Sequence, residues 1–267
     1  MTDRLTDSRR LEGVPTGRVV GVDGCAGGWF AVWDDPATDG LAHAQYDDLD
    51  TVFAAHAEAD RLLVDIPIGL TNAGPRVCDQ QARQRLGLRG VSVFPAPCRA
   101  VVEYCQQTED ASYQRAGEIQ QAHLGSGLSR QAWNITNKIA AMDAYVRNNS
   151  LAVDVYESHP ECCFAALNDG YPLGFSKSTQ TGRAARFAVL DGELEGWKDC
   201  YVSACEEYYF NQVARDDIID AMVLTAAGRH SLATIPENPP EEAGLPLQIV
   251  IPESKPAWVE CLSVAER

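Results

Sequence analysis

The stretch RVVGVDGCAGGWFAVW, residues 18–33, decides the fold. Its first part, residues 18–23, is rich in β-branched side chains, which suit a buried strand. A glycine-rich turn follows at 24–28, and residues 29–33 resume an apolar run. A strand, a tight turn and a second strand together predict a β-hairpin. Asp23 stands at the end of the first strand, where an apolar residue would be the usual choice.

Outward from this hairpin, the remaining pattern alternates strands with helices. Residues 61–66 (RLLVDI) form an apolar run interrupted only by Asp65, which is typical of a central parallel strand. Further strands are expected at 41–46 and 151–156, and a late edge strand at 247–251. We therefore predict an α/β fold: a mixed five-stranded sheet with flanking helices and a large helical insertion, about residues 72–149, between the fourth and fifth strands.

The length and composition favour one domain in a reducing compartment. The 267 residues suffice for a single domain, expected over 18–252, with a flexible tail at 1–17 and another at 253–267. No apolar run approaches the roughly 20 residues that span a bilayer, and the N-terminus lacks a secretory signal, so we expect a cytoplasmic protein with no membrane partner. The nine cysteines include no Cys-x-x-Cys pair, which argues against a zinc site or a disulfide framework.

The charge is strongly acidic, with a net value of −16. Lysine is scarce, and an acidic surface poor in lysine is a halophilic composition. Such a protein is repelled by nucleic acid in dilute buffer. At molar salt the Debye length is about 3 Å, so the repulsion is screened and local contacts determine whether nucleic acid binds. Residues 76–99 hold five arginines and one acid. They form either a solvated helical face or a surface that meets phosphates, for which Arg76, Arg83 and Arg99 are candidates.

Acidic residues interrupt the predicted strands in three places. Asp23 ends the first strand, Asp65 lies in the fourth, and Glu157 closes the fifth. Burying a lone carboxylate is costly, so such acids are paired or bind metal. The carboxyl ends of parallel strands are also where the sites of α/β sheets gather.

A predicted helix at 216–229 supplies further acids. Its start, DDIID, places Asp217 and Asp220 on one face. Asp216 is explained by a role at the helix N-terminus, where the helix dipole favours negative charge. Taken singly, each acid could be a cap or a salt bridge. Together they predict an all-oxygen site for Mg²⁺ or Mn²⁺, in which two ions about 4 Å apart could clamp the water and the leaving oxygen of a phosphodiester.

Six stretches resemble a known family in sequence order over about residues 18–230. They are GVDGCAGGW (21–29), VDIPIGL (64–70), VFPAPCRA (93–100), SGLSRQAWNITNKI (126–139), YESHPE (156–161) and DDIIDAM (216–222). The family is the domain-of-unknown-function family 429. The resemblance implies an RNase H-like fold and a predicted nuclease. By similarity to that superfamily, Asp23 and Asp65 match the first- and fourth-strand acids, and Asp217 and Asp220 match the late-helix acids.

Other residues receive roles from the same family motifs. His159 could orient the site or help proton transfer, and a structural hydrogen bond beside Pro160 is an equal alternative. Lys177 and Arg183 are similar to a Lys-then-Gly-Arg pattern of the family and could hold a phosphate, although a solvated loop is the alternative. Trp133 could stack on a base or belong to the core.

The expected function is hydrolysis of DNA or RNA phosphodiester bonds by a two-metal nuclease, with Asp23, Asp65, Asp217, Asp220, Glu157 and His159 as catalytic residues. Resolvase-like action would predict a homodimer. One alternative is a phosphotransferase or ATPase relative of the actin-like fold, because DGCAGG is similar to the phosphate-binding turn of the first hairpin in that fold. The sequence shows no second glycine-rich hairpin to complete such a site. A non-catalytic nucleic-acid-binding module is the other alternative.

Overall fold

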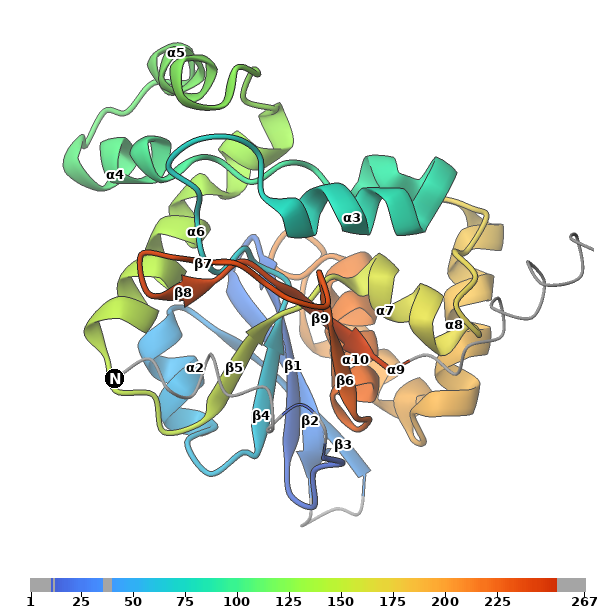
Figure 1. Ribbon diagram of the computed structural model, residues 1–267. Helices are drawn as coiled ribbons and strands as arrows, with labels where there is room; N and C mark the ends of the chain where they lie inside the picture. The colour runs from blue at the N-terminus through green and yellow to red at the C-terminus, as the bar shows by residue number, and fades with distance from the viewer. Residues whose placement is uncertain (1–10, 12, 36–39, 254–267) are drawn as a thin grey trace, which may run out of the picture.

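The computed structural model describes residue 11 and residues 13–35 and 40–253. At its centre lies a five-stranded sheet in the order β3-β2-β1-β4-β5 (Figure 1). β2 is antiparallel to both of its neighbours, whereas β1, β4 and β5 are parallel. The predicted α/β class and mixed five-stranded sheet are therefore confirmed. The strands are β1 (Val19–Cys25), β2 (Gly28–Asp35), β3 (Gly40–Tyr46), β4 (Arg61–Val64) and β5 (Asp154–Glu157).

The turn between β1 and β2 requires glycine. Gly28 has a φ of 127°, and a Cβ atom there would lie 2.2 Å from the carbonyl oxygen of Tyr46. A side chain at this position would combine backbone strain with a backbone clash. The glycine-rich stretch that marks the hairpin in the sequence thus allows the third strand to pass close to the turn.

Helices cover both faces of the sheet. The side chains of Val20 and Val22 point to the face covered by α2 (Leu49–Ala55) and α6 (Arg130–Asn148). Gly21 points to the opposite face, where a Cβ atom would lie 2.1 Å from the carbonyl oxygen of Ala221 in α10 (Arg215–Gly228). The absence of a side chain at Gly21 lets α10 lie directly against the strand. Thr225 fixes this approach, because its hydroxyl accepts from Gly21 N and donates to Val32 O.

The remaining helices and two small sheets surround this core. The predicted late strand is found as β9 but is not an edge of the main sheet. It pairs with β6 in a separate two-stranded sheet and touches the end of β5 through one parallel bridge, Ser158 to Val250. The elements are α7 (Pro160–Leu167), α8 (Gln180–Glu193), α9 (Trp197–Glu207), β6 (Leu232–Ile235), β7 (Glu241–Glu242), β8 (Leu245–Pro246) and β9 (Ile249–Pro252).

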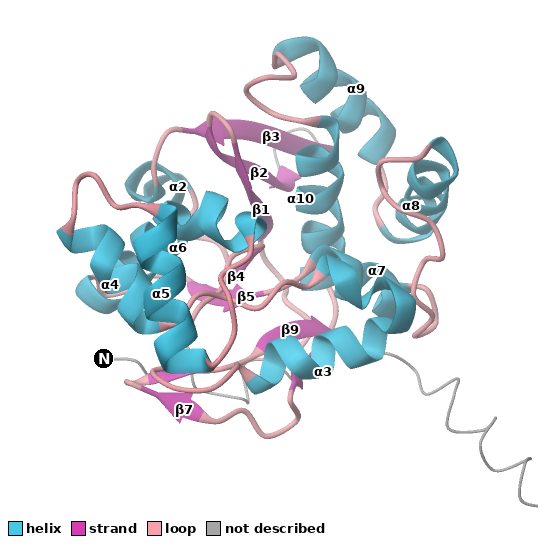
Figure 2. Ribbon diagram, turned by 90° about the horizontal axis from the view of Figure 1, so that it is seen from above, coloured by secondary structure: helices cyan, strands magenta, loops and turns pink. Residues whose placement is uncertain are grey.

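The predicted helical insertion between β4 and β5 has a small core of its own. Buried side chains of α4, α5 and α6, among them Val101, Ala116 and Ala132, pack together apart from the two faces of the sheet. The insertion lies over the end of the sheet at which β1, β4 and β5 terminate (Figures 1 and 2). Its elements are α3 (Val77–Leu86), the 3₁₀ helix η2 (Gly87–Ser92), α4 (Arg99–Gln107), α5 (Tyr113–Leu124) and α6.

Residues 11 and 13–17, the described part of the expected N-terminal tail, contact the body of the domain. Leu11 is buried and its carbonyl oxygen accepts from Leu232 N at 2.8 Å. Gly17 N donates to the Asp60 carboxylate at 2.7 Å. The C-terminal tail, beyond residue 253, falls outside the described residues. No helix in the described ranges is both long enough and apolar enough to cross a membrane.

Candidate metal centre

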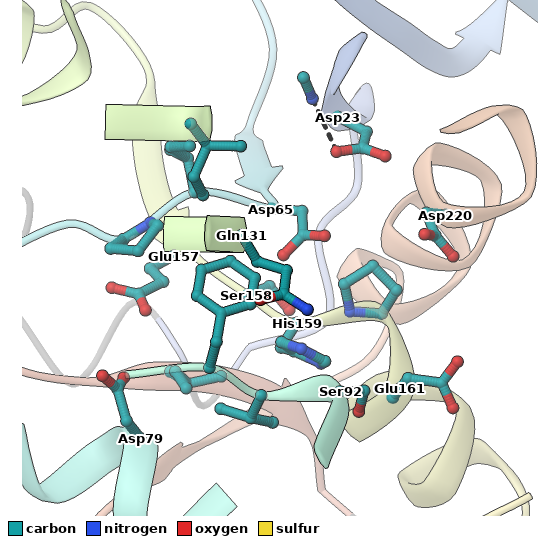
Figure 3. A pocket seen from close by; sticks show the side chains of 18 of the residues that line it. Asp23, Asp65, Asp79, Ser92, Gln131, Glu157, Ser158, His159, Glu161 and Asp220 are labelled. Carbon is teal, nitrogen blue, oxygen red and sulfur yellow. Dashed lines mark hydrogen bonds between the residues drawn. The ribbon is translucent and has the colours of Figure 1, made fainter. Parts of the chain in front are cut away.

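Three carboxylates meet where the strands end beneath the insertion. Asp23 lies near the end of β1, Asp65 follows β4 directly, and Asp220 lies in the second turn of α10. One oxygen of each can be chosen so that the three lie within 4.8 Å of one another. Figure 3 shows the carboxyl groups of Asp23, Asp65 and Asp220 around a common space. The set is confined enough to hold one metal ion through oxygen ligands.

The register of the strands explains why these acids meet. Val22 is level with Val64 in the parallel pair of β1 and β4, and Asp65 N donates to Val22 O at 3.0 Å. Asp23 and Asp65 therefore occupy equivalent positions on adjacent strands. Because side chains alternate between the faces of a sheet, equivalent positions point the same way. The close contact of α10 with Gly21 brings Asp220 to the same place.

Burial and mutual repulsion make these acids hard to ionise. Burial, followed by repulsion from Asp65 and Asp220, raises the pKa of Asp23 well above its ordinary value. Burial is also the largest cause that raises the pKa of Asp65 to about 7 and that of Asp220 to about 6. Among the described residues, Asp220 Oδ1 is a buried oxygen without a hydrogen-bond partner. A divalent cation would satisfy that oxygen and remove the repulsion, so the donor set fits Mg²⁺ or Mn²⁺.

Asp217 lines the same pocket but is also bound to its own helix. Its Oδ2 accepts from Ala214 N at 2.9 Å, which satisfies a backbone donor at the start of α10. Burial raises its pKa to about 6, although the hydrogen bond from Ala214 opposes this shift. The capping role expected of Asp216 thus belongs to Asp217. Asp216 faces Lys177 instead, at 3.5 Å.

Lys177, for which the sequence suggested a phosphate contact or a solvated loop, brings a positive charge to the acid cluster. Its ammonium lies 2.5 Å from Asp220 Oδ2. Burial alone would lower the pKa of Lys177, but attraction to Asp220 and Asp23 outweighs it and the pKa is raised. The lysine therefore stays charged at neutral pH. It lies in the loop before α8, whose N-terminal residue is Gln180.

Glu157 belongs to a second buried cluster. Its carboxylate forms a short ion pair with Arg76 and accepts from Ile68 N at 2.6 Å. Asp79 lies 3.2 Å from the same arginine. In Figure 3 Glu157 points toward Asp79 and away from Asp23, Asp65 and Asp220. Cys78, Asp79 and Glu157 could also offer ligand atoms, but the Arg76 guanidinium already pairs with both carboxylates.

This cluster corrects the expectation for Arg76. Its side chain is 1% exposed and is held by Asp79 and Glu157, so it cannot meet a phosphate. Although burial lowers the pKa of Arg76, these acids outweigh the effect and raise it. Both alternatives from the sequence, a solvated helical face and a phosphate-binding surface, placed this arginine at the surface. Its physical role is to compensate two buried carboxylates.

His159 lines the pocket that contains the acids. Burial lowers the pKa of its imidazole, although Glu161 and Asp220 oppose the shift, and the ring is therefore neutral at pH 7. Among the described residues, its Nδ1 is buried without a hydrogen-bond partner. Glu161 in turn forms a short ion pair with the buried Arg186 and lies 3.9 Å from Arg89. The ring also has a hydrogen bond with the backbone of Ser92, which supports the structural alternative for His159.

Two predicted substrate contacts of the insertion lie elsewhere. Arg99 is buried and pairs with Asp143 at 3.1 Å. The guanidinium of Arg83 donates to the carbonyl oxygen of Val93. In the part of the chain that the structure describes, neither lines the pocket of the acids. Arg99 thus joins α4 to α6 and is too buried for a phosphate-binding surface, and Arg83 joins α3 to the loop after η2.

Arg183 and Trp133 are likewise outside this pocket, judged on the described residues. Arg183 donates to the carbonyl oxygen of Ser178 at 3.1 Å and so closes the loop at the start of α8. Trp133 lies edge-on to Tyr113 in the small core of the insertion, with 5.9 Å between ring centroids. The core alternative for Trp133 is therefore the one that the structure supports.

The pocket has a volume of about 430 Å³ and includes residues that the sequence reasoning missed. Gln131, Ile135 and Lys138 enter it from α6. Lys138 donates to Gly28 O at 2.6 Å. These three positions follow the i, i+4, i+7 spacing of one helix face, within the stretch that resembled the family. That spacing, together with a lysine in a lysine-poor chain, was the available signal.

Comparison with known proteins identifies a family without a known function. A family model described as "Protein of unknown function (DUF429)" matches residues 21–241. No curated protein and no solved structure gives a significant match. The matched range includes Asp23, Asp65, Asp217, Asp220 and Lys177. Because the model covers most of the 267 residues, the chain belongs to the DUF429 family.

Proposed function

We propose that this protein is a divalent-metal-dependent nuclease that hydrolyses phosphodiester bonds of nucleic acid. The observation that carries the proposal is the set of Asp23, Asp65 and Asp220, whose oxygens lie within 4.8 Å of one another. Asp23 and Asp220 are buried, and Asp65 is partly buried. Acids that repel one another in a pocket are stable as a group when a cation neutralises them. Oxygen-only sites of this kind suit Mg²⁺ or Mn²⁺.

The proposal includes an RNase H-like fold. The strand order β3-β2-β1-β4-β5, with β2 antiparallel to its neighbours, supports it. So does the origin of the acids in the first strand, directly after the fourth strand, and in a late helix that packs on the first strand. Fold alone does not define an activity, so hydrolysis is inferred from the residues of the site.

The residues of the chain have separable roles in this proposal. Asp23, Asp65 and Asp220 hold the cation, with Asp217 beside them. A bound divalent ion would supply Lewis acidity, activate water and neutralise charge that develops on the phosphate. Lys177 can donate to a phosphate oxygen. The neutral His159 ring can accept a proton at a ring nitrogen or orient a water molecule.

The number of ions remains a prediction. The two-metal form of the mechanism requires a second site next to the three-carboxylate set, and Asp217 is the residue placed to contribute to it. Titration calorimetry with Mn²⁺ measures this directly. Two ions per chain would support the two-metal form, and one ion would limit the site to the carboxylates of Asp23, Asp65 and Asp220.

The actin-like alternative has less support from the hairpin turn. In such proteins the turn leaves backbone groups for a phosphate. Here Gly27 N donates to Gln212 O at 2.9 Å, and Gly27 O accepts from the Gln45 side chain at 2.6 Å. Gly28 O accepts from Lys138. These polar groups are already paired within the chain, so the turn is a structural connection rather than a phosphate cradle.

Cleavage of a labelled substrate panel tests the proposal. The panel comprises single-stranded, duplex and junction DNA, RNA and an RNA–DNA hybrid, with Mg²⁺ or Mn²⁺ at low and molar salt. Asp23→Asn and Asp217→Asn should lower cleavage by about a hundredfold or more, because each removes a charge from the acid cluster. The matched control is Asp191→Asn, an exposed acid paired with Lys198. It should retain the wild-type rate.

Two outcomes would contradict the nuclease proposal. If cleavage survives Asp23→Asn and Asp217→Asn, the activity comes from another site or a contaminant. If nothing is cleaved and Mn²⁺ does not raise the melting temperature, a non-catalytic binding module becomes the better account. Near-native circular dichroism of each variant excludes misfolding as the cause of a lost activity.

A further inference from the structure

The acids lie at the bottom of a pocket that the helical insertion covers. η2 and the loop after it, Val91 to Phe94, line one side of this pocket, and α6 lines another. Figure 2, which views the molecule from the insertion side, shows α3 and α6 on either side of the strand ends. Asp23 is 8% exposed and Asp220 is 2% exposed. A phosphodiester must therefore enter the pocket to reach them.

The volume of the pocket limits what can enter. Its 430 Å³ lies in the range of roughly 300–1,000 Å³ that proteins use to enclose one small molecule. Base-paired duplex keeps its bases stacked inside the helix, and enzymes that need a nucleotide in a pocket act on single strands or extrude the nucleotide. The space suits one nucleotide and its phosphate, whereas it is too small for a base-paired segment.

The lining of the pocket combines two kinds of side chain. The carboxylates and Lys177 are the charged kind. An apolar wall is formed by Val91, Val93, Phe94 and Ile135, and the lining also includes the Gln131 amide and the charged side chains of Asp79, Arg89 and Glu157. Val91 is 73% exposed at the rim. In Figure 3 the Gln131 side chain extends into the pocket toward His159.

This wall has the features of a nucleobase site. A partly buried phenylalanine offers a face on which any base can stack, and aliphatic side chains cover the other surfaces of a base. An amide can donate to and accept from the edge of a base. A protein with a net charge of −16 gains little from long-range attraction to phosphate, so short-range stacking is a suitable source of affinity.

We infer that Val91, Phe94, Gln131 and Ile135 form a subsite for the base of one unpaired nucleotide, and that the substrate is single-stranded or locally unpaired nucleic acid. The inference rests on the proposed nuclease function, because it assigns the neighbouring phosphate to the carboxylates. It adds a base-binding surface that the acids themselves do not require. It also predicts that duplex must open before it is cleaved.

Binding of nucleoside 5′-monophosphates compared with ribose 5-phosphate tests the subsite without any cleavage. Titration calorimetry with Mn²⁺ at molar salt should show tighter binding of the nucleotides by roughly five- to a hundredfold, as one stacked base provides. Phe94→Ala should reduce nucleotide affinity to that of ribose 5-phosphate, whose own affinity stays unchanged. Phe94→Trp should retain the preference. Equal affinity of both compounds for the wild-type protein would overturn the inference.

Further variants guard against misfolding and nonspecific effects. Gln131→Ala changes an exposed helix residue, so it should fold normally and still weaken nucleotide binding. The matched control is Phe210→Ala, an exposed aromatic residue that does not line the pocket in the described structure. It should bind nucleotides as the wild type does. If Gln131→Ala and Phe94→Ala both keep the full nucleotide preference, the base binds elsewhere and the inference is wrong.

Cleavage of one labelled strand, alone and in a blunt duplex, separates this inference from the nuclease proposal. The single strand should be cut at least about tenfold faster, because the duplex must unpair a nucleotide first. Equal rates would overturn the inference and leave the nuclease proposal standing. Preference for nucleotides without cleavage of any substrate would support the base subsite and refute the nuclease proposal.

Discussion

The ammonium group of Lys177 lies 2.5 Å from the Asp220 carboxylate and 3.5 Å from that of Asp216. The lysine thus supplies part of the positive charge that the cluster of Asp23, Asp65 and Asp220 needs. A metal ion bound by the same acids must share Asp220 with it. The lysine therefore both stabilises the metal-free site and opposes metal binding.

Lys177→Met should bind Mn²⁺ about fivefold more tightly than the wild type. The reason is the loss of a competing charge, which is partly exposed and so contributes only about 1 kcal/mol. Titration calorimetry measures the affinity. Lys177→Arg keeps the charge and is the matched control, with an affinity near that of the wild type. Weaker Mn²⁺ binding by Lys177→Met would show that the lysine supports the site instead.

Asp65→Asn should make the metal-free protein more stable at pH 8. Burial, with repulsion from Asp217, raises the pKa of Asp65 to about 7 in spite of Lys177, so its ionisation above that pH destabilises the fold. The expected gain is on the order of 1–4 kcal/mol, since one pKa unit corresponds to about 1.4 kcal/mol. Urea unfolding measures it. The variant should also lose the stabilisation by Mn²⁺, and an unchanged response to Mn²⁺ would remove Asp65 from the metal site.

The melting temperature of the metal-free protein should fall as the pH rises from about 6.5 to 8. The folded state holds protons on Asp65, with a pKa of about 7, that the unfolded chain has already released. A group whose pKa is higher in the folded state contributes its full stabilisation at pH values below its pKa in the unfolded chain. That stabilisation is lost as the pH rises through its pKa in the folded state. Because Mn²⁺ binds the ionised acids, its stabilising effect should grow over the same range. Scanning fluorimetry with and without Mn²⁺ measures both trends, and a constant difference would contradict them.

The buried pair of Arg76 and Glu157 should be structural rather than metal-binding. Arg76→Met leaves Glu157 and Asp79 without their cation and should lower the free energy of unfolding by about 3–5 kcal/mol. Glu157→Gln should cost less and should keep the response to Mn²⁺. Denaturant unfolding and Mn²⁺ titration measure these effects. Loss of Mn²⁺ binding in Glu157→Gln alone would return Glu157 to the site.

The position of Glu157 shows where sequence reasoning reached its limit. The interrupted apolar runs located Asp23 and Asp65, and helical spacing located Asp217 and Asp220. Glu157 also ends a strand, but it is level with Val64 rather than with Asp65. Because side chains alternate between faces, this one-residue difference points Glu157 away from the acids. The register that decides this is a tertiary property, which the sequence pattern does not contain.

The arginines of the insertion illustrate a related limit. Charge counting found a local excess of arginine near the site, but Arg76 and Arg99 are buried against acids far away in sequence. Local composition cannot reveal such partners. The helix α9, with its mixture of charged residues and cysteine, and the separate pairing of β6 with β9 also depend on contacts between distant segments.

Gly21→Ala should test how α10 is placed. The added Cβ would lie 2.1 Å from the carbonyl oxygen of Ala221, so the helix must shift or the fold must strain. We expect the free energy of unfolding to fall by at least about 1–3 kcal/mol. Mn²⁺ binding should also weaken, because Asp220 moves with the helix. Gly127→Ala is the matched control, because nothing lies within 4 Å of the added Cβ atom and the backbone there does not have a positive φ. Wild-type stability of Gly21→Ala would contradict the close packing.

The metal centre is the central claim, and anomalous diffraction from a crystal grown with Mn²⁺ tests it most directly. The account predicts a manganese peak at about 2.1 Å from oxygens of Asp23, Asp65 and Asp220, close to the distance typical of Mg²⁺. No peak at these acids at saturating Mn²⁺, or a peak only beside Asp79 and Glu157, would contradict it.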